Sequence, residues 1–330
     1  MDDIIKETTG PVILVTGACG QIGTELVTAL RAKYGKEAVV ASDIHAATPT
    51  LQEKGPYAKL NVLDKGALVK LVNDFGITQI YHLAAVLSAS GEKNPLVAWE
   101  LNMAGLLNVL ETARLHKLDK IFWPSSIAVF GPSSPHNECP QDALTDPTTV
   151  YGISKCAGEN WCAYYHRQYG LDVRSIRYPG LISYSANAGG GTTDYAVEIF
   201  HEAIKNGSYT CFLKEDTGLP MMYMEDAVNA TIQLMEAPEH TITVRNSYNI
   251  AGMSFTPAEL IKAIKKHIPE LEVMFKPDSR QQIADSWPAS INDEPAKKDW
   301  GLHAKYDLAA MVADMLLHLN PATKEKLLFN

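Results

Sequence analysis

The sequence predicts an α/β protein built on a doubly wound parallel sheet, with a smaller α/β domain toward the C-terminus. Short apolar runs alternate with longer segments of helical periodicity from about residue 12 to residue 178, as such a sheet requires. The first apolar run passes through a glycine-rich turn into a helix, and after residue 180 small polar residues and glycines replace the alternation. A chain of 330 residues suits these two domains and is short for three.

The first strand, turn and helix come from V-I-L-V-T-G-A-C-G-Q-I-G, residues 12–23. Gly17 permits the turn, Gly20 lets the backbone approach a pyrophosphate, and Gly23 lets the helix pack against the strand. Asp43 ends the next apolar run, 20 residues beyond Gly23, where an acid binds a ribose 2′-hydroxyl and repels a 2′-phosphate. The pattern predicts a Rossmann-type site for NAD in preference to NADP. The alternative is an ordinary strand-to-helix turn in which Asp43 is a cap.

The next elements continue the alternation of strand and helix. Asp64 has the position of a helix cap, because apolar residues recur at helical spacing after it. Ala84 and Ala85 follow an apolar strand, at the edge where open α/β sheets bind ligands. Beyond the strand that ends at Asp43, strands are expected at residues 57–60, 78–83, 120–123 and 171–177, and long helices over residues 94–117 and from Tyr151.

The later part of the chain has the pattern of a second domain folded over one end of the cofactor. Helices are expected from about residues 192–194 with a Thr or Asp cap, partly over 221–235, over 255–268 and over about 306–319, with one more strand at 247–251. We expect residues 1–178, with about 222–250, to form the NAD-binding domain. Residues from about 179–221 and 251–330 then form the substrate-binding domain.

Composition narrows the possible partners and the location. A net charge of −9 argues against nucleic acid or an anionic membrane as a main partner. The chain has no apolar run long enough for a transmembrane helix and no apolar signal core near its start, so a cytoplasmic location is expected. The cysteines are five in number and include no C-x-x-C pair, which favours reduced thiols over a disulfide framework. No histidine pattern has zinc-ligand spacing, so no metal is expected.

Tyr151 and Lys155 are the strongest candidates for chemistry. They lie four residues apart at the start of a helix, so their side chains project from one face. A nearby ammonium favours the phenolate and lowers the pKa of a tyrosine from about 10 toward neutrality, which makes it a general base for an alcohol. Ser126 ends the preceding strand and can donate a hydrogen bond to the reacting oxygen. The alternative is a Tyr–Lys contact on a helix surface.

T-G-x-x-G-x-x-G, the H-L-A-A segment, Ser126 and Y-x-x-x-K together resemble the extended short-chain dehydrogenase/reductase family over nearly the whole chain. The resemblance implies that Tyr151 is the acid/base and that Lys155 holds the nicotinamide ribose. Ser126 would polarise the substrate oxygen, and Asn102 would support a proton-relay water. The segment 178–180 would pack on the nicotinamide. Where the family often has Asp contacting the adenine, this chain has Asn61, whose oxygen still accepts that bond.

Several separate blocks resemble one branch of the family, which oxidises the β-hydroxyl of L-threonine to 2-amino-3-oxobutanoate with NAD. These blocks are A-A-V-L-S-A-S-G-E-K, R-Y-P-G-L-I-S-Y, G-G-G-T-T-D-Y-A-V-E-I-F and L-P-M-M-Y-M-E-D-A. Hydroxyl-bearing side chains near the expected pocket suit a small polar substrate. Backbone N–H groups of residues 189–193 could hold its carboxylate, unless this run is a lid without direct contact. Trp287 could wall the pocket or belong to the core. A homodimer through the helices at about 94–117 and 150–168 is implied by the resemblance.

Two competing functions remain on the same scaffold. Nucleotide-sugar epimerases and dehydratases resemble the first 180 residues, but they typically have an arginine seven residues before the acid equivalent to Asp226. That position is Leu219 here, and losing a cation at a diphosphate site argues against such a substrate. The other competitor is a non-enzymatic NAD-sensing protein, which would not need Ser126, Tyr151 and Lys155 together.

The predicted site comprises three overlapping sets. The catalytic set is Tyr151, Lys155 and Ser126. The cofactor-binding set is Gly17, Gly20, Gln21, Ile22, Gly23, Asp43, Asn61, Val62, Leu83, Ala84, Ala85, Asn102, Lys155, Tyr178, Pro179 and Gly180. The substrate-binding set is Ser88, Ser90, Ser126, Tyr151, Gly191, Thr192 and Trp287.

Overall fold

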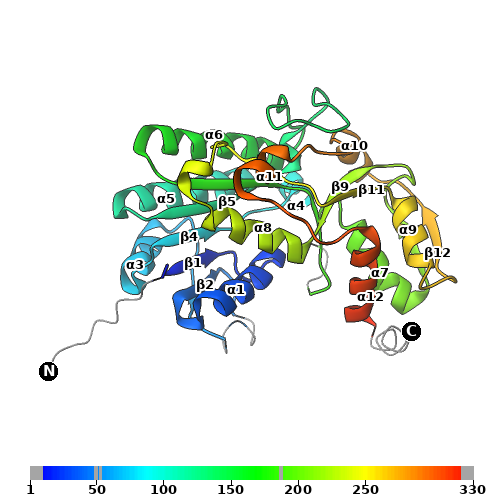
Figure 1. Cartoon of the computed structure of the whole chain (residues 1–330), viewed down its shortest axis with the longest axis horizontal. Coiled ribbons are helices and arrows are strands. Elements are labelled where there is room, and N and C mark those ends of the chain that lie inside the picture. Colours follow the sequence, from blue (N-terminus) through cyan, green and yellow to red (C-terminus); the bar gives the residue numbers. More distant parts are fainter. Residues whose placement is uncertain (1–9, 48–50, 52–53, 186–188, 321–330) are drawn as a thin grey trace.

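A parallel seven-stranded sheet forms the centre of the computed structural model, which describes residues 10–47, 51, 54–185 and 189–320 (Figure 1). Within that part of the chain the strand order is β10-β6-β5-β4-β1-β2-β3, and every neighbouring pair is parallel. The predicted fold class is therefore confirmed. The strands are β1 Ile13–Thr16, β2 Val39–Asp43, β3 Tyr57–Lys59, β4 Gln79–His82, β5 Lys120–Ser126, β6 Val173–Tyr178 and β10 Tyr248–Asn249.

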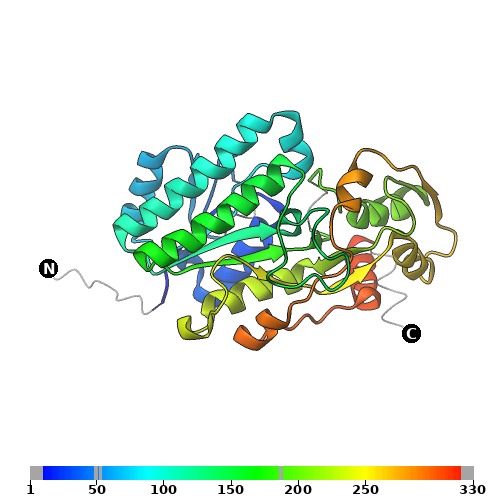
Figure 2. The same cartoon turned by 90° about the horizontal axis from the view of Figure 1, so that it is seen from above.

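Helices cover both faces of this sheet, which makes three layers (Figure 2). Successive side chains of β1 explain why both faces are apolar. Ile13 and Val15 pack against α1 and α8, whereas Leu14 packs with residues of α3, α5 and α6. The covering helices are α1 Gln21–Tyr34 and α8 Met224–Glu236 on one face, and α3 Lys65–Phe75, α5 Pro95–His116 and α6 Val150–Tyr169 on the other.

A second group of elements lies beyond the carboxyl ends of the sheet strands, on the right in Figures 1 and 2. Its core is a separate cluster of buried apolar side chains that also takes in η2, Ile127–Val129. Its strands are β7 Gly180–Ile182, β8 Ser208–Cys211, β9 Leu219–Tyr223, β11 Met253–Phe255 and β12 Glu272–Phe275. Its helices are α7 Tyr195–Asn206, α9 Pro257–Lys265, α10 Arg280–Asp285 and α12 Leu308–Leu319. The remaining short elements are α4 Ser88–Lys93, α11 Glu294–Trp300, η1 Lys36–Ala38 and η3 Glu239–Thr241.

The structure differs from the sequence prediction chiefly in this second group. The segment predicted to be partly helical over 221–235 begins as strand β9, and the helix begins only at Met224. All five residues of β9 are buried, and β9 pairs with β7 on one side and β11 on the other. Pairing with segments distant in the chain therefore decides the conformation here. Strands β7, β8, β11 and β12 and helices α4, α10 and α11 were not predicted.

Candidate active site

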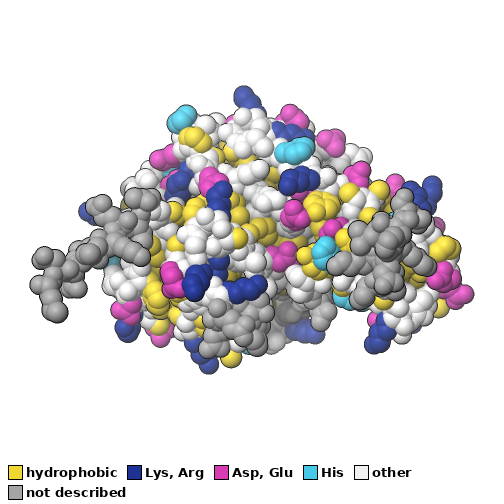
Figure 3. All heavy atoms as spheres, turned by 60° about the horizontal axis from the view of Figure 1, so that its bottom comes forward, with side chains coloured by type: hydrophobic (Ala, Val, Ile, Leu, Met, Phe, Trp, Pro, Cys, Tyr) yellow, Lys and Arg dark blue, Asp and Glu magenta, His cyan; other side chains and the backbone are white. Residues whose placement is uncertain are grey.

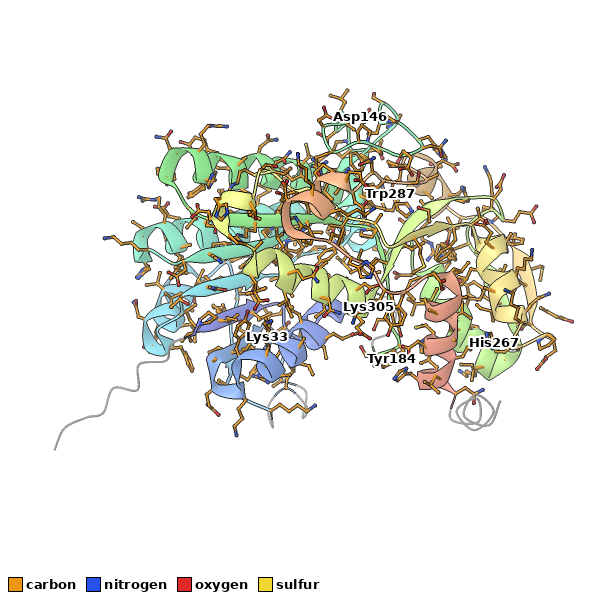
Figure 4. All side chains as sticks on the ribbon, in the orientation of Figure 1. Lys33, Asp146, Tyr184, His267, Trp287 and Lys305 are labelled. Carbon is orange, nitrogen blue, oxygen red and sulfur yellow. The ribbon has the colours of Figure 1, made fainter. Side chains whose placement is uncertain are left out.

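A cavity of about 470 Å³ opens at the carboxyl edge of the parallel sheet. Its walls come from the ends of β1, β2, β4, β5 and β6, from α6, and from the second group of elements. In Figure 4, Trp287, which follows α10, reaches this wall from the side of the second group. All residues of the three predicted sets line the cavity except Asn102 and Ser90. The side chain of Ser90 lies outside the part of the chain that the structure describes.

The glycine turn makes a close-fitting cradle at one end of the cavity. Gly17 has φ +72°, and a Cβ on it would lie 2.7 Å from the backbone nitrogen of Ala84. A Cβ on Gly23 would lie 2.3 Å from the carbonyl oxygen of Gly17. Helix α1 begins here with Gly20 as its N-cap, no side-chain cap and no acid in its first turn. Its first N–H groups can therefore receive a phosphate, and the cradle fits the pyrophosphate of a dinucleotide.

Asp43 is held in a defined position on the wall beside this cradle. It ends β2 and is buried. Its Oδ2 accepts a hydrogen bond from the Cys19 N–H at 3.0 Å, and its Oδ1 accepts one from the His45 N–H at 3.1 Å. The ring Nδ1 of His45 also lies 2.9 Å from Oδ1, so Oδ2 is the oxygen that keeps capacity for another donor such as a ribose hydroxyl. Asn61 also lines the cavity, and its Oδ1 accepts a hydrogen bond from the Leu63 N–H at 3.1 Å.

Ser126, Tyr151 and Lys155 converge at the middle of the cavity. Ser126 is the last residue of β5, and Tyr151 and Lys155 lie one turn apart on α6. The Lys155 ammonium donates to the Pro124 carbonyl oxygen at 2.5 Å and stands 4.5 Å from the centre of the Trp123 ring and 5.5 Å from that of Tyr151. These contacts hold a buried cation beside a phenol and a serine, which is an arrangement suited to proton transfer.

Burial is the largest cause of the pKa shifts of Tyr151 and Lys155 on α6. Loss of hydration raises the pKa of Tyr151 to about 12, while its hydrogen bond with Ser126 acts in the opposite direction. Burial also lowers the pKa of Lys155 to about 7. The sequence-based expectation that Lys155 lowers the pKa of Tyr151 toward neutrality is therefore wrong in direction for this structure. The reason is that loss of hydration on burial outweighs the hydrogen bond with Ser126.

Two hydroxyl-bearing residues of the predicted substrate-binding set lie on the cavity wall. Ser88 and Thr192 are both buried, and the Thr192 hydroxyl has no hydrogen-bond partner among the described residues. A buried hydroxyl without a partner on a cavity wall is free to bind a ligand.

The glycine run before α7 differs from expectation, because its N–H groups already bind a carboxylate of the chain. Oδ2 of Asp194 accepts hydrogen bonds from the N–H groups of Gly190 at 2.7 Å and Gly191 at 2.6 Å. Asp194 is the N-cap residue of α7, but its side chain turns back to these glycines and makes no cap bond to the helix. Two of the N–H groups expected to hold a substrate carboxylate, those of Gly190 and Gly191, are thus occupied, and Asp194 itself lines the cavity.

Asn102 acts on the cavity indirectly. It is buried on α5, its Oδ1 accepts a hydrogen bond from the Val86 N–H at 2.8 Å, and its Nδ2 donates to the Val86 carbonyl and to Ser154. Val86 lines the cavity, so Asn102 holds a wall segment in place. Leu219 is fully buried in the core of the second group, so no cation stands at that position.

Sequence reasoning missed several residues of the wall. Most of them adjoin predicted residues at the carboxyl ends of strands, a position that could have identified them. Within the described part of the chain, no cluster of His, Cys, Asp and Glu could hold a metal ion. No helix of that part is long and apolar enough to span a bilayer. The missed wall residues are Cys19, Ile44, His45, Leu60, Val86, Leu87, Leu101, Pro124, Ser125, Ile127, Leu181, Thr193 and Asp194.

Comparisons with known proteins agree over nearly the whole chain. The profile of the NAD dependent epimerase/dehydratase family matches residues 13–251. An uncharacterized epimerase/dehydratase of Staphylococcus haemolyticus is 47% identical over 316 residues, covering 95% of this chain and 99% of that protein. The structure of the GalE-like L-threonine dehydrogenase from Cupriavidus necator is 55% identical, covering 94% of this chain and 100% of that one with a TM-score of 0.92. A monomeric L-threonine 3-dehydrogenase from a metagenome is 47% identical, covering 94% and 99% with a TM-score of 0.91.

Proposed function

Because this chain belongs to the NAD-dependent epimerase/dehydratase family, we propose that it oxidises the β-hydroxyl of L-threonine with NAD, giving 2-amino-3-oxobutanoate. The observation that carries the proposal is the convergence of Ser126, Tyr151 and Lys155 on one cavity that also holds the glycine cradle and Asp43. The similarity to L-threonine dehydrogenases over 94% of the chain supports the choice of substrate. The enzyme acts in the cytoplasm.

The cradle at the start of α1 would hold the pyrophosphate of NAD, and Asp43 would accept a hydrogen bond from the adenosine ribose. Asn61 and Val62 would border the adenine, and residues 83–85 would pass beneath the dinucleotide, since they line the same cavity. Lys155 would bind the nicotinamide ribose, and residues 178–180 would pack against the nicotinamide ring. When bound, NAD supplies the electrophilic carbon that accepts a hydride from Cβ of the substrate.

Tyr151 accepts the hydroxyl proton of the substrate on its phenol oxygen as the hydride leaves Cβ. Ser126 donates a hydrogen bond to the oxygen that becomes the ketone, which steadies the charge on it. The Lys155 ammonium, 5.5 Å from the Tyr151 ring, stabilises the phenolate that takes this proton. Burial raises the pKa of Tyr151 to about 12, so the fraction of phenolate grows with pH. Because the pKa of Lys155 is about 7, the ammonium that stabilises this phenolate is lost above that pH, so turnover rises up to about pH 7 and then levels off.

The polar wall opposite these groups suits an amino acid. Thr192 offers a buried hydroxyl without a partner, and Ser88 lies beside the same cavity. The Asp194 carboxylate places a negative charge on this wall, which complements the ammonium group of L-threonine. Trp287 closes the wall with an apolar ring. Where nucleotide-sugar enzymes typically have an arginine this chain has Leu219, which argues against a nucleotide-sugar diphosphate as the substrate.

The decisive experiment measures NADH formation by the purified protein with L-threonine, D-threonine, L-serine and UDP-galactose in turn. We expect L-threonine to give the fastest reaction and D-threonine to give none. Conversion of UDP-galactose alone would identify the protein as a nucleotide-sugar enzyme. NAD binding without turnover of any of the four would favour an NAD-sensing protein.

A further inference from the structure

A second pair of buried charges lies directly behind the catalytic residues. Glu159 is on α6, one turn after Lys155, and its carboxylate accepts hydrogen bonds from Arg177 Nε at 2.9 Å and Nη2 at 2.8 Å. The side chains of the pair are only 4% and 2% exposed. The Ser125 hydroxyl donates to the same carboxylate at 2.6 Å. Ser125 lines the cavity and immediately precedes Ser126. The ion pair of Glu159 and Arg177 is therefore connected to the site by the hydrogen bond from Ser125 to Glu159.

Arg177 extends the contact network to the other side of the cavity. Its Nη1 donates to the Gln141 carbonyl at 2.9 Å and to Asn249 Oδ1 at 3.0 Å, and its guanidinium lies over the Phe130 ring. It directly precedes Tyr178, where the cavity wall continues. One ion pair therefore joins β5, β6, β10, α6 and the loop that contains Gln141. These segments frame the catalytic centre.

We propose that Glu159, held by Arg177, is a positioning residue that fixes the Ser125–Ser126 segment and supplies the negative charge that stabilises the Lys155 ammonium. The inference rests on the proposed oxidation, because it assigns Glu159 a role in that reaction. The inference goes beyond the proposed function because Glu159 touches neither the cavity nor the reacting atoms. Its effect passes through two residues that do line the cavity, Ser125 and Lys155.

Glu159 lies one turn after Lys155 on α6, and its own ion pair is with Arg177. Four titratable groups act on Lys155 or lie against it: Tyr151, Glu159 and Cys162 on α6, and His82 at the end of β4. Burial raises the pKa of Tyr151 to about 12 and that of the Cys162 thiol well above its usual range, and it lowers the pKa of His82 to about 3. These three groups are therefore neutral near pH 7. Burial lowers the pKa of Lys155, and Cys162 and then Glu159 act to raise it. Of these two side chains, Glu159 is the one that lies in an ion pair, with Arg177.

The chain offers a matched control in the same strand. Asp172 and Arg174 form another buried ion pair, with side chains 7% and 0% exposed, three residues from Arg177. Arg174 donates to the carbonyl oxygens of Leu234 and Ala237, at the end of α8, and neither Asp172 nor Arg174 lines the cavity. Losing this pair has a structural cost similar to that of losing the other pair. Losing the pair of Asp172 and Arg174, however, leaves the surroundings of Lys155 unchanged.

The test compares Glu159→Gln with Asp172→Asn and with the wild type. The Lys155 titration is followed by NMR in full-length protein carrying [13Cε]lysine, and Lys155→Met identifies its signal. We expect Glu159→Gln to move this titration to lower pH by about 1 unit. For turnover that follows the charged fraction of a lysine with a pKa of about 7, kcat then falls about twofold at pH 6, fivefold at pH 7 and tenfold at pH 8. KM for L-threonine stays within about threefold of the wild-type value, because no substrate contact is removed.

Asp172→Asn is expected to lower stability without moving the Lys155 titration or the pH dependence of kcat. If Glu159→Gln does not fold, the double variant Glu159→Met/Arg177→Met replaces both charges by apolar side chains and leaves none unpaired. It is expected to displace the Lys155 titration in the same direction but by less, because the positive charge of Arg177 is removed together with the carboxylate. An unmoved Lys155 titration, or equal pH profiles for the Glu159 and Asp172 variants, overturns the inference. Failure of the wild type to oxidise L-threonine overturns the proposed function instead, since the titration is read without substrate.

Discussion

Tyr151 is the residue on which the proposed chemistry depends. Its phenol lines the cavity beside Ser126 and above the Lys155 ammonium, so removing its oxygen leaves the cofactor cradle untouched. We predict that Tyr151→Phe lowers kcat by about 10²–10⁴, the usual contribution of a general base, and changes NADH affinity little. Steady-state kinetics and NADH fluorescence titration measure the two effects. Near-normal turnover in this variant would contradict the mechanism.

Asp43 is the residue expected to select NAD over NADP. Its carboxylate is buried at the end of β2 and would repel a 2′-phosphate. We predict that Asp43→Ser weakens NAD use and raises the relative kcat/KM with NADP. Kinetics with both cofactors measure the ratio, and Asp64→Ser, at the cap of α3, serves as the control because it lies outside the cavity. An unchanged ratio would show that Asp43 does not bind the ribose.

Lys155 gives a prediction about stability as well as activity. Its pKa is lowered to about 7 in the folded protein, so the unfolded chain binds more protons between about pH 7 and 10.5. The free energy of unfolding therefore rises with pH across this window, and the cost of the buried charge is full below pH 7. We predict that Lys155→Met abolishes turnover but raises the free energy of unfolding by on the order of a few kcal/mol near pH 6. The contacts that the ammonium makes in the wild type are lost in this variant, which offsets part of the gain.

Urea unfolding of the wild type and Lys155→Met at pH 6, 8 and 10 measures this effect. The difference between the two proteins should shrink as pH rises, because the wild-type lysine loses its charge. The exposed Lys262 on α9 supplies the control, and Lys262→Met should shift stability equally at the three pH values. A constant difference between wild type and Lys155→Met would contradict the prediction.

Helix α1 illustrates how an element is positioned by one close contact. Gly23 is the third residue of α1, and a Cβ there would lie 2.3 Å from the Gly17 carbonyl oxygen and 2.8 Å from Ala18 Cα. Both neighbours are backbone atoms of the turn, so the helix or the turn must shift. We predict that Gly23→Ala lowers the free energy of unfolding by about 1–3 kcal/mol and weakens NADH binding at least tenfold.

Gly66 provides the matched control for this substitution, because it lies in the first turn of α3. A Cβ on Gly66 would meet only the Asp64 side chain, at 3.4 Å. Gly66→Ala should therefore stabilise the protein by up to about 1 kcal/mol, since alanine is the better helix former. Chemical unfolding and NADH titration on both variants test the pair. Equal effects would show that the Gly17–Gly23 contact does not position α1.

Strand β9 and the side chain of Asp194, at the start of the correctly predicted helix α7, show where prediction from local pattern fails. Helical spacing correctly placed α1, α3, α5 and α6, whose faces are apolar at short intervals along the chain. The side chain of Asp194 binds glycine N–H groups before α7 in place of the helix N-terminus, and β9 forms between two strands distant in sequence. Both results depend on partners that local periodicity does not report.

At the scale of the whole molecule, α5 and α6 present an exposed apolar face. They pack beside each other on one side of the sheet, the upper side in Figure 2. Figure 3, in which the bottom of Figure 1 comes forward, shows a face where basic, acidic and hydrophobic side chains are interspersed. We propose that the apolar face joins two copies of the chain, since exposed apolar patches of this kind mark interfaces. The exposed apolar residues of these helices are Leu96, Val97, Trp99, Leu115, Ile153, Trp161, Tyr164 and Tyr169.

Light scattering tests this homodimer directly. We predict that the wild type is a dimer at micromolar concentration and that Val97→Glu/Ile153→Glu is a folded monomer, because charges at an apolar interface are costly to bury. Met274 on β12 is 70% exposed, and Met274→Glu should leave the dimer intact. A monomeric wild type, like the metagenomic relative, would contradict the proposal.

The division into two domains at about residue 178 also stays a prediction, which limited proteolysis can test.

The sequence by itself determined the fold class, the glycine cradle, the position of Asp43, and the spacing that sets Tyr151 and Lys155 on one face of α6. These features depend on neighbours a few residues away, whose geometry is nearly the same in any such strand, turn or helix. Only the tertiary structure decided the direction of the Tyr151 pKa shift, the use of the glycine N–H groups by Asp194, and the pairing of Glu159 with Arg177. Burial and Coulomb interaction act between residues far apart in the chain, so their outcome exists only once the chain is folded.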